Sequence, residues 1–179
     1  IAPPRVVSKI KKSSSFVGVN ISKLKSIKVK NFKINPDTSQ DPKTFSPFIL
    51  NIPAGMAFGT GSHETTRGCL LSMQYFKWFN VKRALDLGCG SGILALAAAR
   101  LWSCKVIAAD NDPVAIDVAE MNISQNDKLG LVRAVLSAGC KHVTIRDKKF
   151  DLVTANIFSG ELISMSREIS RVVSPRGLV

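Results

Sequence analysis

From residue 49 onward, short apolar runs alternate with longer segments whose apolar residues recur at helical spacing. Short, nearly continuous apolar runs predict strands that are buried on both faces of a parallel sheet. The expected strands cover residues 49–52, 84–87, 105–109, 132–136 and 152–155, with another from Leu178 onward. Helices are expected over residues 64–79, 93–101 and 161–173, and Pro113 suits the first position of a further helix. This alternation predicts an α/β fold with a doubly wound, mostly parallel sheet.

Residues 1–48 follow a different pattern. They are rich in Lys, Ser and Pro and contain only short strand-like stretches, among them residues 27–34 with partial alternation. Pro36, Pro42 and Pro47 punctuate the end of this segment, which is typical of a linker. We therefore predict a short N-terminal arm or linker over residues 1–48 and one folded domain over residues 49–179. Because the chain opens on Ile1 and stops in a strand-like segment, we expect a fragment truncated at both ends, with C-terminal strands missing.

The charge of the chain is concentrated in this arm. The net charge is +12, and residues 1–48 hold ten of the 25 Lys/Arg but only two of the 13 acidic residues. Such a patch attracts nucleic acid, ribosomal particles or an acidic protein, or it is a solvated face that aids solubility. Four cysteines without a CxxC pair, and only two histidines, predict neither a metal site nor a disulfide framework. No secretory signal or long apolar run is visible, so a cytoplasmic location is expected.

A glycine-rich turn follows the strand expected at residues 84–87. Asp86 stands at the end of this strand, and Gly88, Gly90 and Gly92 follow it in G-x-G-x-G spacing. Glycines let a ligand approach the backbone closely, and dinucleotide binders more commonly use G-x-G-x-x-G. A carboxylate at Asp86 suits an ammonium group, and Asp110 at the end of the next strand is placed to accept hydrogen bonds from a ribose. The pattern indicates S-adenosylmethionine, whereas the alternative is that both carboxylates only cap loops.

Four motifs, two of which include the glycine turn and Asp110, together indicate a specific family. They lie at residues 57–66 (AFGTGSHETT), residues 86–92 (DLGCGSG), residues 110–113 (DNDP) with Ala115 and Asn122, and residues 155–157 (ANI). In order and spacing the chain resembles the methyltransferases of large-subunit ribosomal protein eleven over roughly residues 49–179. That family has a substrate-recognition domain before its catalytic domain, so the arm would be a remnant of such a domain. Residues 49–179 would be the S-adenosylmethionine-binding methyltransferase domain.

The resemblance also implies roles for individual residues. Phe58, Thr60 and Gly61 would form a lid over the cofactor. Its methionine part would lie against Asp86, Gly88 and Gly90. Asp110 would hold the ribose, with Asn111 beside the adenine. Thr65, like Thr66, is expected to bind the cofactor or to cap a helix.

Asn156 is the one residue expected to be catalytic, and it is also expected to contact the cofactor. The resemblance places it near both the transferred methyl group and the incoming amine, which it could orient through its side-chain carbonyl. The sequence shows no obvious general base, so a positioning mechanism with a water as proton acceptor is expected. His63 is more readily explained by capping or packing than by proton transfer.

The preferred reading is a methyltransferase that uses S-adenosylmethionine to methylate α-amino and lysine ε-amino groups of a ribosomal protein. The basic arm would contact the ribosome or RNA. One alternative is a related methyltransferase acting on RNA or a small molecule, which the positive charge of the arm supports. Another is a ribosome- or nucleic-acid-binding module without turnover. A nicotinamide-dependent oxidoreductase is disfavoured by the glycine spacing.

Overall fold

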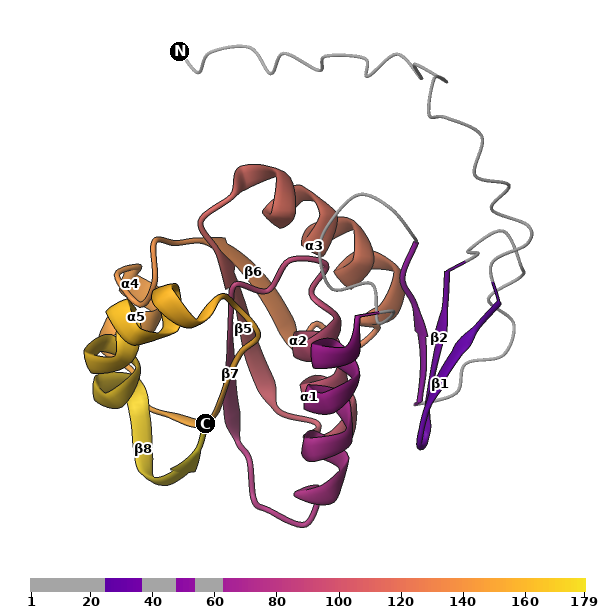
Figure 1. Ribbon diagram of the computed structural model, residues 1–179, viewed down its shortest axis with the longest axis horizontal. Coiled ribbons are helices and arrows are strands. Elements are labelled where there is room, and N and C mark those ends of the chain that lie inside the picture. The colour runs from indigo at the N-terminus through magenta and orange to yellow at the C-terminus, as the bar shows by residue number, and fades with distance from the viewer. Residues whose placement is uncertain (1–24, 37–47, 54–62) are drawn as a thin grey trace.

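The computed structural model describes residues 25–36, 48–53 and 63–179 of the chain. Figure 1 shows a parallel sheet between two layers of helices, with smaller strands outside one of the layers. The main sheet has five strands, which are β4 (Arg83–Leu87), β5 (Lys105–Asp110), β6 (Val132–Leu136), β7 (Phe150–Ala155) and β8 (Val173–Leu178). The helices are α1 (Glu64–Tyr75), α2 (Ile93–Trp102), α3 (Pro113–Asn126), α4 (Val143–Arg146) and α5 (Ser159–Val172).

The strand order of the main sheet is β6-β5-β4-β7-β8, and every neighbouring pair is parallel. The chain moves outward from β4 through β5 to β6, then returns to add β7 and β8 on the other side. The predicted doubly wound parallel sheet is thus confirmed. In such sheets ligands bind at the carboxyl edge, where the strand order reverses. Here that edge is formed by the ends of β4, β5 and β7.

Alternating residues of the central strand pack into two separate cores. Ala84 faces the core shared with α1, α2 and α3, whereas Leu85 and Leu87 face the core shared with α5. All residues from Ile93 to Ala99 of α2 are buried. The four alanines of this helix give it a narrow surface, so α2 can lie close to the sheet.

A three-stranded sheet packs on the outer side of the α1–α3 layer (Figure 1). It consists of β1 (Ile27–Val29), β2 (Phe32–Asn35) and β3 (Ile49–Asn51). β1 and β2 form a hairpin, and β3 joins β2 in parallel. Val29, Phe32 and Ile34 are buried in the same core as α1 and α2. Residues 27–35 of the expected arm thus share a core with the larger domain, and the division after residue 48 stays a prediction.

Two buried amide side chains tie this small sheet to the helices. Gln74 of α1 accepts from Asn31 N–H at 2.9 Å and donates to the Val29 carbonyl at 3.0 Å. Asn126 of α3 accepts from Asn51 N–H at 2.8 Å and donates to its carbonyl at 2.9 Å. Because both amides are almost fully buried, these bonds replace water at the junction.

Some element bounds differ from those expected. α1 ends at Tyr75 and not at residue 79, because the chain turns where Phe79 N–H bonds the Phe76 carbonyl. β8 begins at Val173, five residues before the expected start of the strand at Leu178. The short helix α4 was not expected. None of the helices in the described part of the chain is long and apolar enough to cross a membrane.

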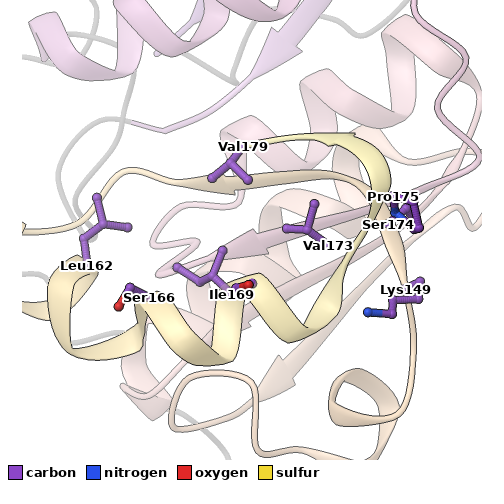
Figure 2. Close-up of a pocket in the computed structure, with 9 residues that line it drawn as sticks. Lys149, Leu162, Ser166, Ile169, Val173, Ser174, Pro175 and Val179 are labelled. Carbon is purple, nitrogen blue, oxygen red and sulfur yellow. The ribbon is translucent and has the colours of Figure 1, made fainter.

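An apolar groove of about 660 Å³ runs between α5 and β8, as Figure 2 shows. Leu162 and Ile169 of the helix and Val173 and Pro175 of the strand lie along it. None of the predicted site residues lines this groove. The candidate site lies instead at the carboxyl edge of the sheet.

Candidate cofactor and active site

Two cavities share a wall at the carboxyl edge of the main sheet. The first cavity has a volume of about 650 Å³ and includes His63, Thr65 and Asn156 in its lining. The second cavity has a volume of about 370 Å³ and is bordered by the loop after β6 and by α5. Both are lined by Gly88, Asp110, Asn111, Ile157 and Glu161. The structure therefore brings most of the described predicted site residues to one hollow.

The glycine turn after β4 forms the common wall of the two cavities. Gly88 has φ +64°, and a Cβ built on it would lie 2.2 Å from Ile157 Cγ2. At the other end of the turn, Asn122 of α3 donates to the Ser91 carbonyl at 2.8 Å. The turn is thus held in place by α3 and by the segment after β7, and a larger residue at position 88 has no room.

Replacing Gly88 by alanine is expected to lower the free energy of unfolding by about 2–4 kcal/mol, because the left-handed backbone and the overlap with Ile157 both disfavour a side chain. Urea unfolding measures this change. Gly68→Ala is the matched control: Gly68 lies in α1 with nothing within 4 Å of its Cβ position. That variant should gain about 0.5–1 kcal/mol from helix propensity. Equal effects of the two substitutions would contradict the packing described for the turn.

Asp110 lies at the end of β5, beside the glycine turn, and is 9% exposed. Its Oδ2 accepts from Gly90 N–H at 2.9 Å, and its Oδ1 accepts from Asp112 N–H at 3.0 Å. Each carboxylate oxygen can accept more than one hydrogen bond, so both remain able to accept from a diol in the cavity. The two backbone donors fix the carboxylate in a single orientation toward that cavity.

Asp86 is more deeply buried than its expected role suggests. It is 1% exposed, and its oxygens accept from Thr154 Oγ1 at 2.7 Å and from Ala95 N–H at 3.1 Å. The cavity wall begins with the next residues of the chain, Leu87 and Gly88. Burial raises the pKa of Asp86 to about 7, although the two hydrogen bonds oppose the shift and Asp110 adds to it. Asp86 is therefore a buried carboxyl group behind the turn.

This burial makes the stability of the fold depend on pH. Between about pH 4 and pH 7 the unfolded chain has lost the Asp86 proton while the folded chain keeps it, so stability falls as pH rises. The loss from this one group has an upper bound of about 4 kcal/mol. We expect Asp86→Asn to remove the loss. The Thr154 hydroxyl, 3.4 Å from the Leu85 carbonyl, can then turn toward that acceptor.

Chemical unfolding of the wild type and Asp86→Asn from pH 4.5 to pH 8 tests this dependence. The difference in free energy of unfolding should move in favour of the variant as pH rises. Two parallel curves would show that Asp86 does not change its protonation across this range.

Asn156 follows β7 and is oriented by a residue of α1. Its Nδ2 donates to Thr66 Oγ1 at 3.1 Å, and Thr66 is fully buried. Because the amide nitrogen is engaged, the side-chain carbonyl is the end available to the first cavity, which Asn156 lines. The arrangement presents a fixed hydrogen-bond acceptor beside the glycine turn.

The start of α1 borders the same cavity. His63 is the N-cap: its Nδ1 accepts from Thr65 N–H at 3.4 Å and lies 2.8 Å from Thr65 Oγ1. The capping interpretation of His63 is confirmed. Thr65 and Asn111 both line the first cavity, as a cofactor-binding role requires. Phe58, Thr60 and Gly61, the expected lid, lie outside the described residues.

Three residues support the site in ways that the sequence did not indicate: Thr66 was expected to bind the cofactor or to cap a helix, and Thr154 and Glu168 were missed. Thr66 lies on the buried face of α1 with Leu70 and Met73, at i, i+4 and i+7, and this spacing could have separated it from Thr65. Thr154 and Glu168 had no comparable signal, because their partners Asp86 and Cys140 are 68 and 28 residues away in the chain.

The five-stranded parallel sheet has the fold of S-adenosylmethionine-dependent methyltransferases. The glycine turn follows β4 in this sheet, and the Asp110 carboxylate lies at the end of β5. One such methyltransferase from Thiobacillus denitrificans, solved with S-adenosyl-L-homocysteine, superposes with a TM-score of 0.52 at 19% identity, covering 62% of this chain and 46% of that one. A ribosomal protein L11 methylase from Lactobacillus delbrueckii subsp. bulgaricus superposes with a TM-score of 0.72 at 27% identity, covering 86% of this chain and 77% of that one.

The sequence comparisons are more specific. Residues 14–179 match the family of ribosomal protein L11 methyltransferases (PrmA). The L11 methyltransferase of Brucella suis is 35% identical over 158 residues, which is 87% of this chain and 55% of that protein. The one from Rhizobium rhizogenes is 33% identical over 166 residues, which is 92% of this chain and 57% of that protein. The chain belongs to the ribosomal protein L11 methyltransferase family, and it spans about half the length of these curated relatives.

Proposed function

We propose that the protein transfers methyl groups from S-adenosylmethionine to amino groups of a ribosomal protein, at α-amino and lysine ε-amino nitrogens. The observation that carries this proposal is the amide of Asn156. Thr66 holds its nitrogen, so its carbonyl oxygen is available to the cavity that Gly88 and Asp110 also line. Family membership and the likeness to solved methyltransferases of the same fold support the proposal.

The residues at the carboxyl edge fit S-adenosylmethionine. Asp110 offers an oriented carboxylate to a ribose diol, and Asn111 would lie beside the adenine. Gly88 and Gly90 leave room for the methionine part at the turn, with Asp86 as a buried acidic group behind it. Thr65 lines the same hollow. The lid role of Phe58, Thr60 and Gly61 stays a prediction.

When bound, S-adenosylmethionine supplies an already activated methyl group on its sulfonium. The chain then has to hold a neutral amine in line with that group, at about 3–3.5 Å. The Asn156 carbonyl accepts a hydrogen bond from the amine and so directs its lone pair. The Thr66 hydroxyl keeps the amide from turning. A water at the cavity mouth takes the proton that the amine loses.

We further propose that the protein acts in the cytoplasm and contacts the ribosome or RNA through its basic arm. The support is charge: residues 1–48 hold ten of the 25 Lys/Arg of the chain. A cationic segment of this kind brings an enzyme to a polyanionic particle by long-range attraction, which added salt weakens.

Two measurements test the proposed function. Calorimetry should detect binding of S-adenosylmethionine and S-adenosylhomocysteine, and none of a nicotinamide dinucleotide. Transfer of labelled methyl groups should then mark ribosomal protein and leave ribosomal RNA unlabelled. Absence of binding would refute an enzyme that uses this cofactor, whereas label in RNA alone would replace the proposed substrate.

A further inference from the structure

The loop after β6 is held at both ends. Ser137 N–H donates to the Asp110 carbonyl at 2.8 Å, so the loop starts beside the carboxyl end of β5. Ser137 Oγ then donates to the Gly139 carbonyl at 2.7 Å, which closes a tight turn. At the far end, Cys140 N–H donates to Glu168 Oε2 of α5 at 2.9 Å. The loop is therefore fixed to the sheet on one side and to a carboxylate of α5 on the other.

Gly139 lets α5 come close to this loop. Its φ is +63°, and a Cβ at this position would lie 2.7 Å from Glu168 Oε2 and 3.1 Å from Met165 Sδ. Any side chain at position 139 would push the carboxylate away. Burial, with a contribution from the Glu168 charge, raises the pKa of the Cys140 thiol to about 11. The hydrogen bond to Cys140 and the close approach to Gly139 place this carboxylate directly against the loop.

The same loop forms part of the second cavity. Ser137, Ala138 and Gly139 line it together with Asp110 and Asn111. If Asp110 holds the ribose and the base enters the second cavity beside Asn111, the base lies against residues 137–139. A loop that is already fixed loses little conformational entropy when a ligand binds, whereas a free loop must first be ordered.

We infer that Glu168 is a positioning residue: by accepting from Cys140 N–H, it fixes residues 137–140 in the conformation that receives the adenine of S-adenosylmethionine. This inference rests on the proposed function, because it requires that cofactor in the second cavity. Glu168 also lines the second cavity, but the role inferred for it is exerted through the loop, and it carries no step of methyl transfer.

Two neutral variants separate the hydrogen bond from the charge. Glu168→Gln and Glu168→Met both remove the charge and keep the length of the side chain, but only glutamine keeps a carbonyl acceptor for Cys140 N–H. Calorimetry on the full chain would use S-adenosylhomocysteine and S-inosylhomocysteine, which differ only in the base. We expect the methionine variant to bind the adenosyl ligand about tenfold more weakly and to discriminate less between the two bases. The glutamine variant should stay within about threefold of the wild type.

Hydrogen exchange gives a second readout that does not depend on a ligand. The Cys140 amide should exchange faster in Glu168→Met than in the wild type, and Glu168→Gln should restore its protection. Glu120→Gln, which neutralises an exposed carboxylate on α3, is the control and should change neither readout. If the methionine variant does not fold, Glu168→Leu replaces it, because leucine likewise offers no acceptor to Cys140 N–H.

The outcomes separate this inference from the proposed function. Unchanged affinity and base discrimination in Glu168→Met would overturn the role of Glu168. An equal loss in the glutamine and methionine variants would overturn it too, because the charge and not the acceptor would then matter. A wild type that binds neither ligand would instead refute the cofactor, and with it the proposed function.

Discussion

Replacing Asn156 by alanine is expected to lower methyl transfer about 100-fold, while affinity for S-adenosylhomocysteine stays within about threefold. The variant loses the carbonyl that orients the amine, but it leaves Asp110 and the glycine turn untouched. Single-turnover transfer of labelled methyl groups to the ribosomal protein, together with calorimetry, measures both quantities. An equal loss of turnover and cofactor affinity would contradict a role for Asn156 in placing the amine.

Two further variants sharpen this test. Thr66→Val removes the hydroxyl that holds the amide but keeps Asn156, so turnover should fall by an intermediate factor of about tenfold. Asn80→Ala, at an exposed position between α1 and β4, should have no effect. If Thr66→Val were as active as the wild type, the amide would not need this partner to stay oriented.

Replacing Asp110 by alanine is expected to weaken cofactor binding about 10- to 100-fold. The variant loses the acceptor for the ribose, and it also frees the N–H groups of Gly90 and Asp112, so the turn is less well held. Calorimetry with S-adenosylhomocysteine measures the change. Asp117→Ala, an exposed carboxylate on α3, is the matched control. A similar change in both variants would mean that only the net charge matters.

The doubly wound sheet could be predicted from the sequence because its signal is local. Residues 106–109, for example, form a continuous apolar run, and Pro113 begins the helix where its fixed backbone is favourable. The parallel pairing of the strands agrees with the prediction, because a helix between two strands returns the chain to the edge where the first strand began. Four of the five main strands were therefore placed to within two residues at each end.

The departures have physical causes that no local pattern shows. The aromatic run after Tyr75 continues the helical spacing, yet Phe76 and Trp78 are 37% and 74% exposed and the chain turns there. The β1–β2 hairpin turns at Lys30, which has φ +53° without a glycine or proline to announce it. The buried residues of this hairpin alternate over too few positions to predict a sheet from the sequence alone.

The position of the site could be predicted from the sequence, but the contacts between its side chains could not. The glycine turn and Asp110 lie in one short stretch of chain, so their meeting at the carboxyl edge follows from the fold. The contact between Asn156 and Thr66 joins residues 90 positions apart and depends on where α1 lies relative to the segment after β7. The burial of Asp86 likewise depends on Thr154 of the neighbouring strand.

The amide of Asn126 also affects whether another strand can pair with the edge of the small sheet at β3. Asn51 bonds the Asn126 side chain through both its N–H and its carbonyl, while its neighbour Ile52 bonds β2. The outward-facing groups of β3 at this position are therefore already occupied. An open strand edge is a template for pairing with another chain, and natural sheets block such edges. Here a single side chain of α3 closes the edge of β3 at Asn51 against strand addition and self-association.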